Sequence, residues 1–68
     1  MQIMERFTNL QVKVVGEDSN IFNLLGLVTK ELKRNGYRDL AKELPQQIFE
    51  CKNYDKALTI LDRYVELV

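Results

Sequence analysis

Apolar and polar residues alternate near the start of the chain, with Gln11 and Lys13 separating apolar neighbours. An alternation with a period of two is typical of a β-strand that buries one face. We therefore expect a strand over residues 10–15 that ends at Gly16. Its buried face would consist of Leu10, Val12 and Val14.

A single strand cannot satisfy its own backbone N–H and C=O groups, so this strand needs a neighbour. The sequence offers three: residues 2–7, joined to it by a tight turn at Thr8-Asn9; residues 65–68; or the same strand of a second copy. The first would form a short hairpin, and the third would make the protein an obligate dimer. The sequence does not choose among them.

Beyond Gly16 the pattern changes to the helical period of 3.6. Asp18 or Ser19 is expected to cap a helix that runs to about Asn35, because Asn35-Gly36 is a typical helix end. Basic residues near that end suit the negative pole of the helix. The apolar face comprises Ile21, Leu25, Val28 and Leu32, widened by Phe22, Leu24 and Leu27.

Two further helices are expected in the rest of the chain. Apolar residues keep helical spacing from Arg38 to Cys51 across Pro45, so we expect one helix kinked at the proline rather than two short helices. Asn53 is expected to cap the last helix. The inner faces would be Leu40, Leu44, Ile48 and Cys51 in the middle helix, and Ala57, Leu58, Leu61, Tyr64 and Val65 in the last.

These elements define the fold class as α+β, mainly α: one N-terminal strand or short hairpin followed by three helices, in a single small domain over residues 1–68. A chain of this length buries only about 60% of the surface that its unfolded form exposes. Such small domains often gain stability from a partner chain, so a homodimer is one expectation.

Charge and hydropathy indicate what the protein binds and the compartment in which it is found. Ten basic and ten acidic residues give a formal net charge of +0, which argues against binding nucleic acid or an anionic membrane through bulk charge. No stretch is long and apolar enough for a signal peptide or a membrane span. Cys51 is the single cysteine, which favours a reducing compartment over a secreted, disulfide-linked domain. We expect a cytoplasmic protein.

Candidate catalytic groups are sparse. The two carboxylate pairs, Glu17 with Asp18 and Asp62 with Glu66, have structural explanations at a helix start and on the solvated face of the last helix. Because the chain has no histidine, Cys51 lacks a base to activate it, and we interpret it as a small buried hydrophobe. The three glycines, ten residues apart, lack the spacing of a phosphate-binding loop. We expect no enzyme activity, no cofactor and no metal.

Gly26 lies inside the first expected helix, where glycine costs about 1 kcal/mol relative to alanine. Either of two contacts could offset that cost: the close approach of another element of the same chain, or the docking of a partner's side chain. The second makes Gly26 a candidate interface residue.

Tyr37, Tyr54 and Tyr64 provide aromatic surface of the type enriched in protein interfaces. Tyr64 follows the inner face of the last helix and is expected to be mostly buried. Tyr37 and Tyr54 are expected to be partly exposed, and they join Gly26 as candidate interface residues.

One concentration of basic residues spans the end of the first helix and the start of the second, and it is the candidate nucleic-acid contact. A short glycine-containing turn between two helices also resembles helix-turn-helix geometry. Glu31, Asp39 and Glu43 interrupt this basic concentration. The basic residues are Lys30, Lys33, Arg34, Arg38 and Lys42.

Most of the chain resembles small uncharacterised proteins encoded in bacteriophages and integrated mobile elements. The resemblance lies in a strand, a glycine-acidic-asparagine entry into a helix, and a closing helix that starts with tyrosine and aspartate. The matching residues are Gly16, Asp18, Asn20, Phe22, Gly26, Val28 and Leu32, then Tyr54, Asp55, Leu58 and Tyr64-Val65. The resemblance implies a phage or mobile-element accessory protein that acts on a host protein.

The sequence therefore predicts a non-enzymatic protein–protein interaction module that uses an exposed helix face and a strand edge. The alternative is a small nucleic-acid-binding regulator that uses the basic residues around the first helix turn.

Overall fold

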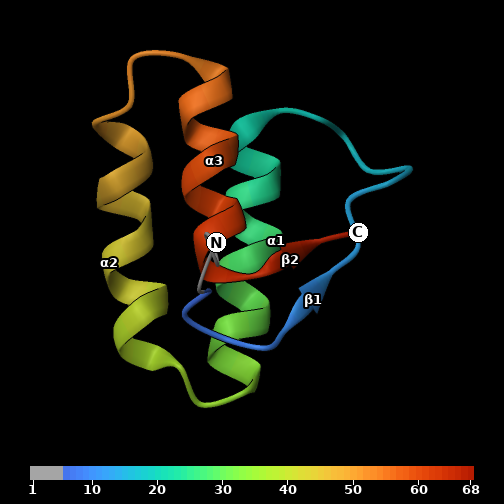
Figure 1. Cartoon of the computed structure of the whole chain (residues 1–68), viewed down its shortest axis with the longest axis vertical. Coiled ribbons are helices and arrows are strands. Elements are labelled where there is room, and N and C mark those ends of the chain that lie inside the picture. The colour runs from blue at the N-terminus through green and yellow to red at the C-terminus, as the bar shows by residue number, and fades with distance from the viewer. Residues whose placement is uncertain (1–5) are drawn as a thin grey trace, which may run out of the picture.

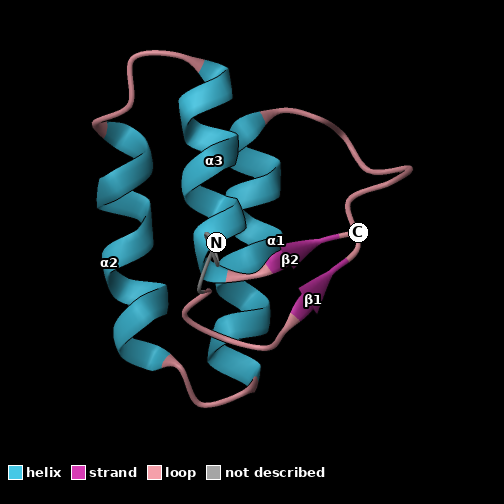
Figure 2. Ribbon diagram, viewed as in Figure 1, coloured by secondary structure: helices cyan, strands magenta, loops and turns pink. Residues whose placement is uncertain are grey.

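A computed structural model describes residues 6–68 of the chain. Three helices pack together, and two strands of two residues each pair beside them (Figures 1 and 2). One strand precedes the helices in the chain and the other follows them. The fold is mainly α with a small β part, as the sequence predicts. In chain order the elements are β1 (Gln11–Val12), α1 (Ile21–Arg34), α2 (Arg38–Phe49), α3 (Tyr54–Tyr64) and β2 (Glu66–Leu67).

The helices form a bundle in which α2 runs alongside α1 in the opposite direction, and α3 returns in the direction of α1 (Figure 1). One end of the bundle therefore holds the start of α1, the end of α2 and the start of α3. The opposite end holds the turn between α1 and α2. This arrangement decides which exposed side chains become neighbours.

The strand near the start of the chain pairs with the residues that follow α3, the second of the three possible neighbours. β1 and β2 are parallel, with Gln11 opposite Glu66 and Val12 opposite Leu67. The hairpin alternative rests on residues 2–7, most of which lie outside the described residues. The strand is shorter than the predicted residues 10–15, but the alternation holds because Val12 is buried between exposed neighbours.

The segment between β1 and α1 makes two local turns before the helix begins. Gly16 has a φ of 87°, a left-handed conformation that glycine adopts without a steric penalty. The prediction of Asp18 or Ser19 as the helix cap is wrong, because Asn20 is the cap: its side chain accepts a hydrogen bond from the N–H of Phe22 at 2.8 Å. Asp18, two residues before the cap, instead accepts a hydrogen bond from the N–H of Asn20 at 3.0 Å.

α1 ends where the sequence predicts. The N–H of Gly36 donates to the carbonyl of Lys33, and the N–H of Tyr37 donates to the carbonyl of Leu32. Together with the φ of 86° at Gly36, these bonds form a Schellman motif, which satisfies carbonyls at the helix end. The chain thereby turns tightly enough for α2 to pack against α1.

α2 is one helix that contains Pro45, as predicted, rather than two short helices. It ends at Phe49 with Glu50 as the C-cap, so Cys51 lies beyond the helix and not in its last turn. Asn53 caps α3 as predicted, because its side chain accepts from the N–H of Lys56 at 2.8 Å. These boundaries place Phe49 and Tyr54 on either side of a short connection.

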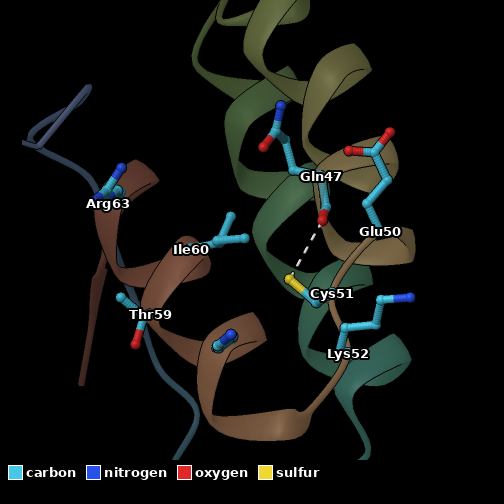
Figure 3. Close-up of a pocket in the computed structure, with 8 residues that line it drawn as sticks. Gln47, Glu50, Cys51, Lys52, Thr59, Ile60 and Arg63 are labelled. Atoms are coloured by element: carbon cyan, nitrogen blue, oxygen red, sulfur yellow. Dashed lines mark hydrogen bonds between the residues drawn. The ribbon is translucent and has the colours of Figure 1, made fainter.

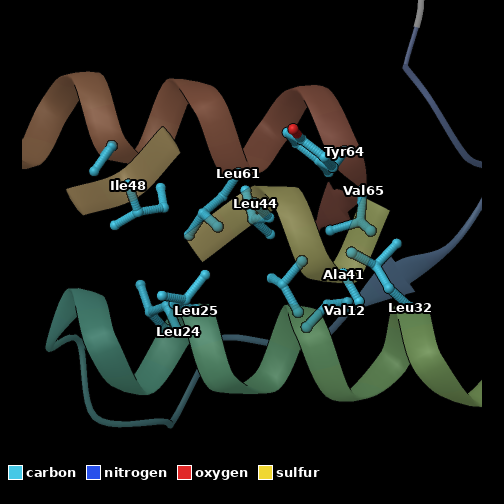
Figure 4. Close-up of a cluster of buried hydrophobic side chains, with 12 residues drawn as sticks. Val12, Leu24, Leu25, Leu32, Ala41, Leu44, Ile48, Leu61, Tyr64 and Val65 are labelled. Atoms are coloured by element: carbon cyan, nitrogen blue, oxygen red, sulfur yellow. The ribbon is translucent and has the colours of Figure 1, made fainter. Parts of the chain in front are cut away.

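The core lies between the three helices and is closed by Val12 from β1 (Figure 4). Every helix contributes at least one aliphatic side chain that is fully buried, and the predicted inner faces of α2 and α3 are confirmed apart from Cys51. Tyr64 is buried, as predicted. Phe22 is a correction, because it was expected to widen the buried face of α1 and is instead exposed. The largest fully buried side chains are Leu32, Leu44, Leu61, Val28 and Val65.

Candidate interaction surface

The two carboxylates of the second predicted pair have separate hydrogen-bond partners. Asp62 accepts a hydrogen bond from the guanidinium of Arg6 at 3.0 Å. Glu66 lies in β2 rather than on the last helix, which corrects the prediction, and it accepts from the side-chain amide of Gln11 at 3.1 Å. Among residues 6–68, carboxylates and the thiol do not gather in a group of three that could hold a metal ion.

Cys51 lies in a cleft between the end of α2 and α3, with a volume of about 480 Å³ (Figure 3). It is half-buried, which corrects the expectation of a buried hydrophobe, and its thiol donates to the carbonyl of Gln47 at 3.4 Å. The cleft carries mixed charge, since Glu50 lines it together with Lys52 and Arg63. The chain has no histidine that could serve as the base for this thiol.

Gly26 is exposed on α1, and a Cβ built on it would meet no atom within 4 Å. The first interpretation of this glycine, a close approach by another element of the same chain, is therefore wrong. The second interpretation, docking of a partner, stays a prediction.

The three tyrosines divide as predicted. Tyr37 and Tyr54 are 36% and 41% exposed, whereas Tyr64 is buried. The hydroxyl of Tyr54 donates to the carbonyl of Ser19 at 2.6 Å, which ties the start of α3 to the segment before α1. The hydroxyl of Tyr64 donates to Glu43 at 3.1 Å, and burial together with that carboxylate raises the pKa of Tyr64 to about 12. Tyr54 is thus available at the surface, and Tyr64 is part of the core.

Two phenylalanines that were not predicted as site residues form an exposed aromatic pair. The ring centroids of Phe22 and Phe49 lie 5.9 Å apart, and the two side chains are 59% and 66% exposed. Both line a pocket of about 260 Å³ at the end of the bundle, together with Tyr54 and the aliphatic Ile21 and Ile48. We call Phe22, Phe49 and Tyr54 the aromatic cluster.

The basic residues of the predicted nucleic-acid contact separate into two groups. Lys33, Arg38 and Lys42 line one depression of about 570 Å³ between α1 and α2, and we call them the basic cluster. Arg34 instead pairs with Glu31 at 3.7 Å, and Lys30 does not line the depression. The two helices are joined by the tight turn at Gly36 and run in opposite directions in Figure 1. The resemblance of this turn to a helix-turn-helix stays a prediction.

No helix in residues 6–68 is both long enough and apolar enough to cross a membrane. The chain matches no protein-family model, no curated protein and no solved structure with which it was compared. Its relation to proteins of phages and mobile elements thus stays a prediction from the residues quoted above.

Proposed function

We propose that the protein is a non-enzymatic interaction module that binds another protein through the aromatic cluster. The observation that supports this proposal is the exposure of Phe22 and Phe49 beside an apolar pocket. Exposed aromatic side chains that gather in one place are characteristic of protein-binding surfaces, because their burial supplies much of the binding free energy.

The rigidity of this end of the bundle also supports the proposal. Phe22 follows the capped start of α1, and the hydrogen bond from Tyr54 to Ser19 holds α3 against the same segment. A surface that is already ordered loses little conformational entropy on binding. The aromatic cluster therefore has the chemistry and the order that a docking site requires.

The partner that we propose is a host protein in the cytoplasm, on the strength of the resemblance to phage and mobile-element proteins and of the single cysteine. One argument for a homodimer no longer applies, because β1 pairs with β2 of the same chain and does not need the strand of a second copy. The exposed Gly26 remains compatible with either type of partner.

Affinity capture from a lysate of the organism that encodes the chain tests the proposal. The variant is Phe22→Ser/Phe49→Ser, and the matched control is Val15→Ser/Val68→Ser, which removes exposed apolar side chains elsewhere. We expect the wild type and the control to retain a protein that the aromatic variant loses, as quantified by mass spectrometry. Equal capture by all three would contradict the proposal.

Light scattering over a dilution series identifies the case in which the partner is a second copy. A concentration-dependent dimer that the aromatic variant no longer forms would assign the aromatic cluster to self-association. A monomer at every concentration would exclude the homodimer.

A nucleic-acid-binding regulator is the second candidate, and the observation that favours it is the convergence of the basic cluster on one depression. Binding to a generic duplex should then weaken as salt increases, because each phosphate contact releases counterions. Absence of duplex binding at low salt would remove this candidate.

A further inference from the structure

Two rows of residues with the same spacing face each other along α1 and α2. Positions separated by four, three and four residues lie on one line of a helix. Because α2 runs opposite to α1, Phe22 meets Phe49 at one end of the rows, and Lys33 meets Arg38 and Lys42 at the other. The rows are Phe22, Gly26, Thr29 and Lys33 on α1, and Arg38, Lys42, Pro45 and Phe49 on α2.

Side chains in the middle of the α1 row project little from the surface. Gly26 has no side chain, and open space surrounds its α-carbon on the outer side. The hydroxyl of Thr29 donates to the carbonyl of Gly26 at 3.1 Å, so this side chain folds back onto its own helix. Eleven residues of helix span about 16 Å, so the pocket at the aromatic cluster and the depression at the basic cluster lie at opposite ends of a surface of roughly this length. We refer to this surface, with a hollow at each end, as the groove.

Two of the three acidic residues that interrupt the basic cluster in the sequence are engaged elsewhere, and the third, Asp39, does not line the depression. Glu31 accepts from the side-chain amide of Asn35 and pairs with Arg34. Glu43 accepts from the hydroxyl of Tyr64, on the side of α2 that faces α3. As a result, the depression is lined by three cations and by Ala41 and Pro45, without a carboxylate.

We propose that this groove binds a peptide segment that carries acidic residues at one end and a large apolar residue at the other. The proposal rests on the proposed function and specifies the chemistry of the partner. The acidic residues would face the basic cluster, and the apolar residue would enter the pocket at Phe22 and Phe49. Complementary charge at one end fixes the direction in which the peptide lies.

A peptide fits these observations better than a nucleic acid. The chain has a net charge of +0, and only three cations line the depression, so few counterions would be released from a polyanion. Ala41 and Pro45 give the basic end an apolar floor, and Ile21 and Ile48 do the same at the aromatic end. Apolar floors at both ends suit aliphatic and aromatic side chains.

Selection from a displayed library of random 12-residue peptides tests the proposal, because twelve residues span the groove in either an extended or a helical conformation. We expect the wild type to enrich sequences with aspartate or glutamate near one end and a large apolar residue about five positions away in an extended peptide, or about eleven positions away in a helical one. The enriched peptides, made synthetically, should bind Lys33→Glu/Lys42→Glu at least tenfold more weakly than the wild type, as measured by fluorescence anisotropy.

The matched control is Lys13→Glu/Lys56→Glu, which changes the net charge equally at exposed positions outside the groove. It should bind the enriched peptides within twofold of the wild type. Circular dichroism melts of both variants confirm that the helices are retained. Equal loss in the control would overturn the proposal, because the effect would then come from net charge alone.

The remaining outcomes separate this inference from the proposed function. Enriched peptides that are neutral, that bind the Lys33→Glu/Lys42→Glu variant normally and that require Phe49 would overturn the acidic partner while supporting protein binding. No enrichment at all would contradict both. A labelled 20-nucleotide RNA or duplex that binds at physiological salt and displaces the peptides would assign the basic cluster to nucleic acid instead.

Discussion

The inner and outer faces of the α1–α2 pair differ in chemistry although the same two helices form both. The inner face consists of aliphatic side chains such as Val28, Leu32 and Leu44, all fully buried. The outer face carries an aromatic pair at one end and three cations at the other. The inner face therefore accounts for stability, and the outer face presents groups that stability does not require.

Because of this difference, residues of the outer groove can be substituted while the fold is kept. A fully buried leucine removes much apolar surface from water, whereas an exposed phenylalanine gains little from the native state. Substitutions on the two faces should accordingly separate loss of stability from loss of binding.

Leu44→Ala should lower the free energy of unfolding by about 2–5 kcal/mol, because it opens a cavity in the middle of the core. Phe49→Ala, on the outer face of the same helix, should lower it by only about 0.5–1.5 kcal/mol, the contribution of an aromatic pair. Urea unfolding of the two variants measures both values. Similar losses would show that the two faces are not distinct.

The free energy of unfolding should also decrease at high pH, because Tyr64 ionises less readily in the core than in the unfolded chain. Its pKa is about 12 in the folded state and about 10 in an unfolded chain, so folding is favoured fully below pH 10 and progressively less as the pH rises from 10 to 12. The loss amounts to at most about 3 kcal/mol, at 1.36 kcal/mol for each pKa unit.

Urea midpoints at pH 8, 10 and 11, compared with those of Tyr64→Phe, isolate this contribution from that of the lysines. The difference between the two proteins should change with pH above 10. A constant difference would mean that Tyr64 ionises equally in both states.

Gly26→Ala should raise the free energy of unfolding by up to about 1 kcal/mol, because the added methyl group meets open space and alanine favours the helix. Gly26→Leu should be tolerated by the fold but should obstruct the middle of the groove and weaken peptide binding. Thermal melts check the first effect and anisotropy the second. A loss of stability in Gly26→Ala would show a close contact at this position.

Lys42→Ala should change stability least, with a gain of a few tenths of a kcal/mol at low salt. Arg38 and Lys42 lie one turn apart on α2, where like charges repel by about 0.2–0.5 kcal/mol. The gain should disappear at 1 M salt as the charges are screened. A loss of stability at low salt would mean that the basic cluster supports the fold.

The three helices were predictable because their apolar residues repeat every three to four positions and each connection contains a terminating residue. Gly36 and Asn53 are the strongest of these signals. The partner of β1 was not predictable from the sequence. A strand of two residues has too few positions for a clear alternation, and the position of β2 depends on where α3 ends in space. The cap of α1 was misplaced because Asp18, Ser19 and Asn20 all have side chains that can accept from a backbone N–H.

The site was less predictable than the fold. The sequence identified Lys33, Arg38 and Lys42, but it could not show that Glu31 and Glu43 turn to other partners. The aromatic pair was missed because Phe22 borders the buried face of α1 and Phe49 adjoins buried Ile48. One signal was available: Phe49 lies off the inner face of α2, where an aromatic side chain does not contribute to the core.

The parallel pair of β1 and β2 has a consequence for the order in which the chain acquires its structure. Gln11 and Glu66 are separated by 55 positions, so their pairing closes almost the longest loop that the chain contains. Long loops are entropically unfavourable to close before the contacts inside them exist. Because β2 follows α3 in the chain, β1 cannot pair with β2 during synthesis on the ribosome until α3 has emerged.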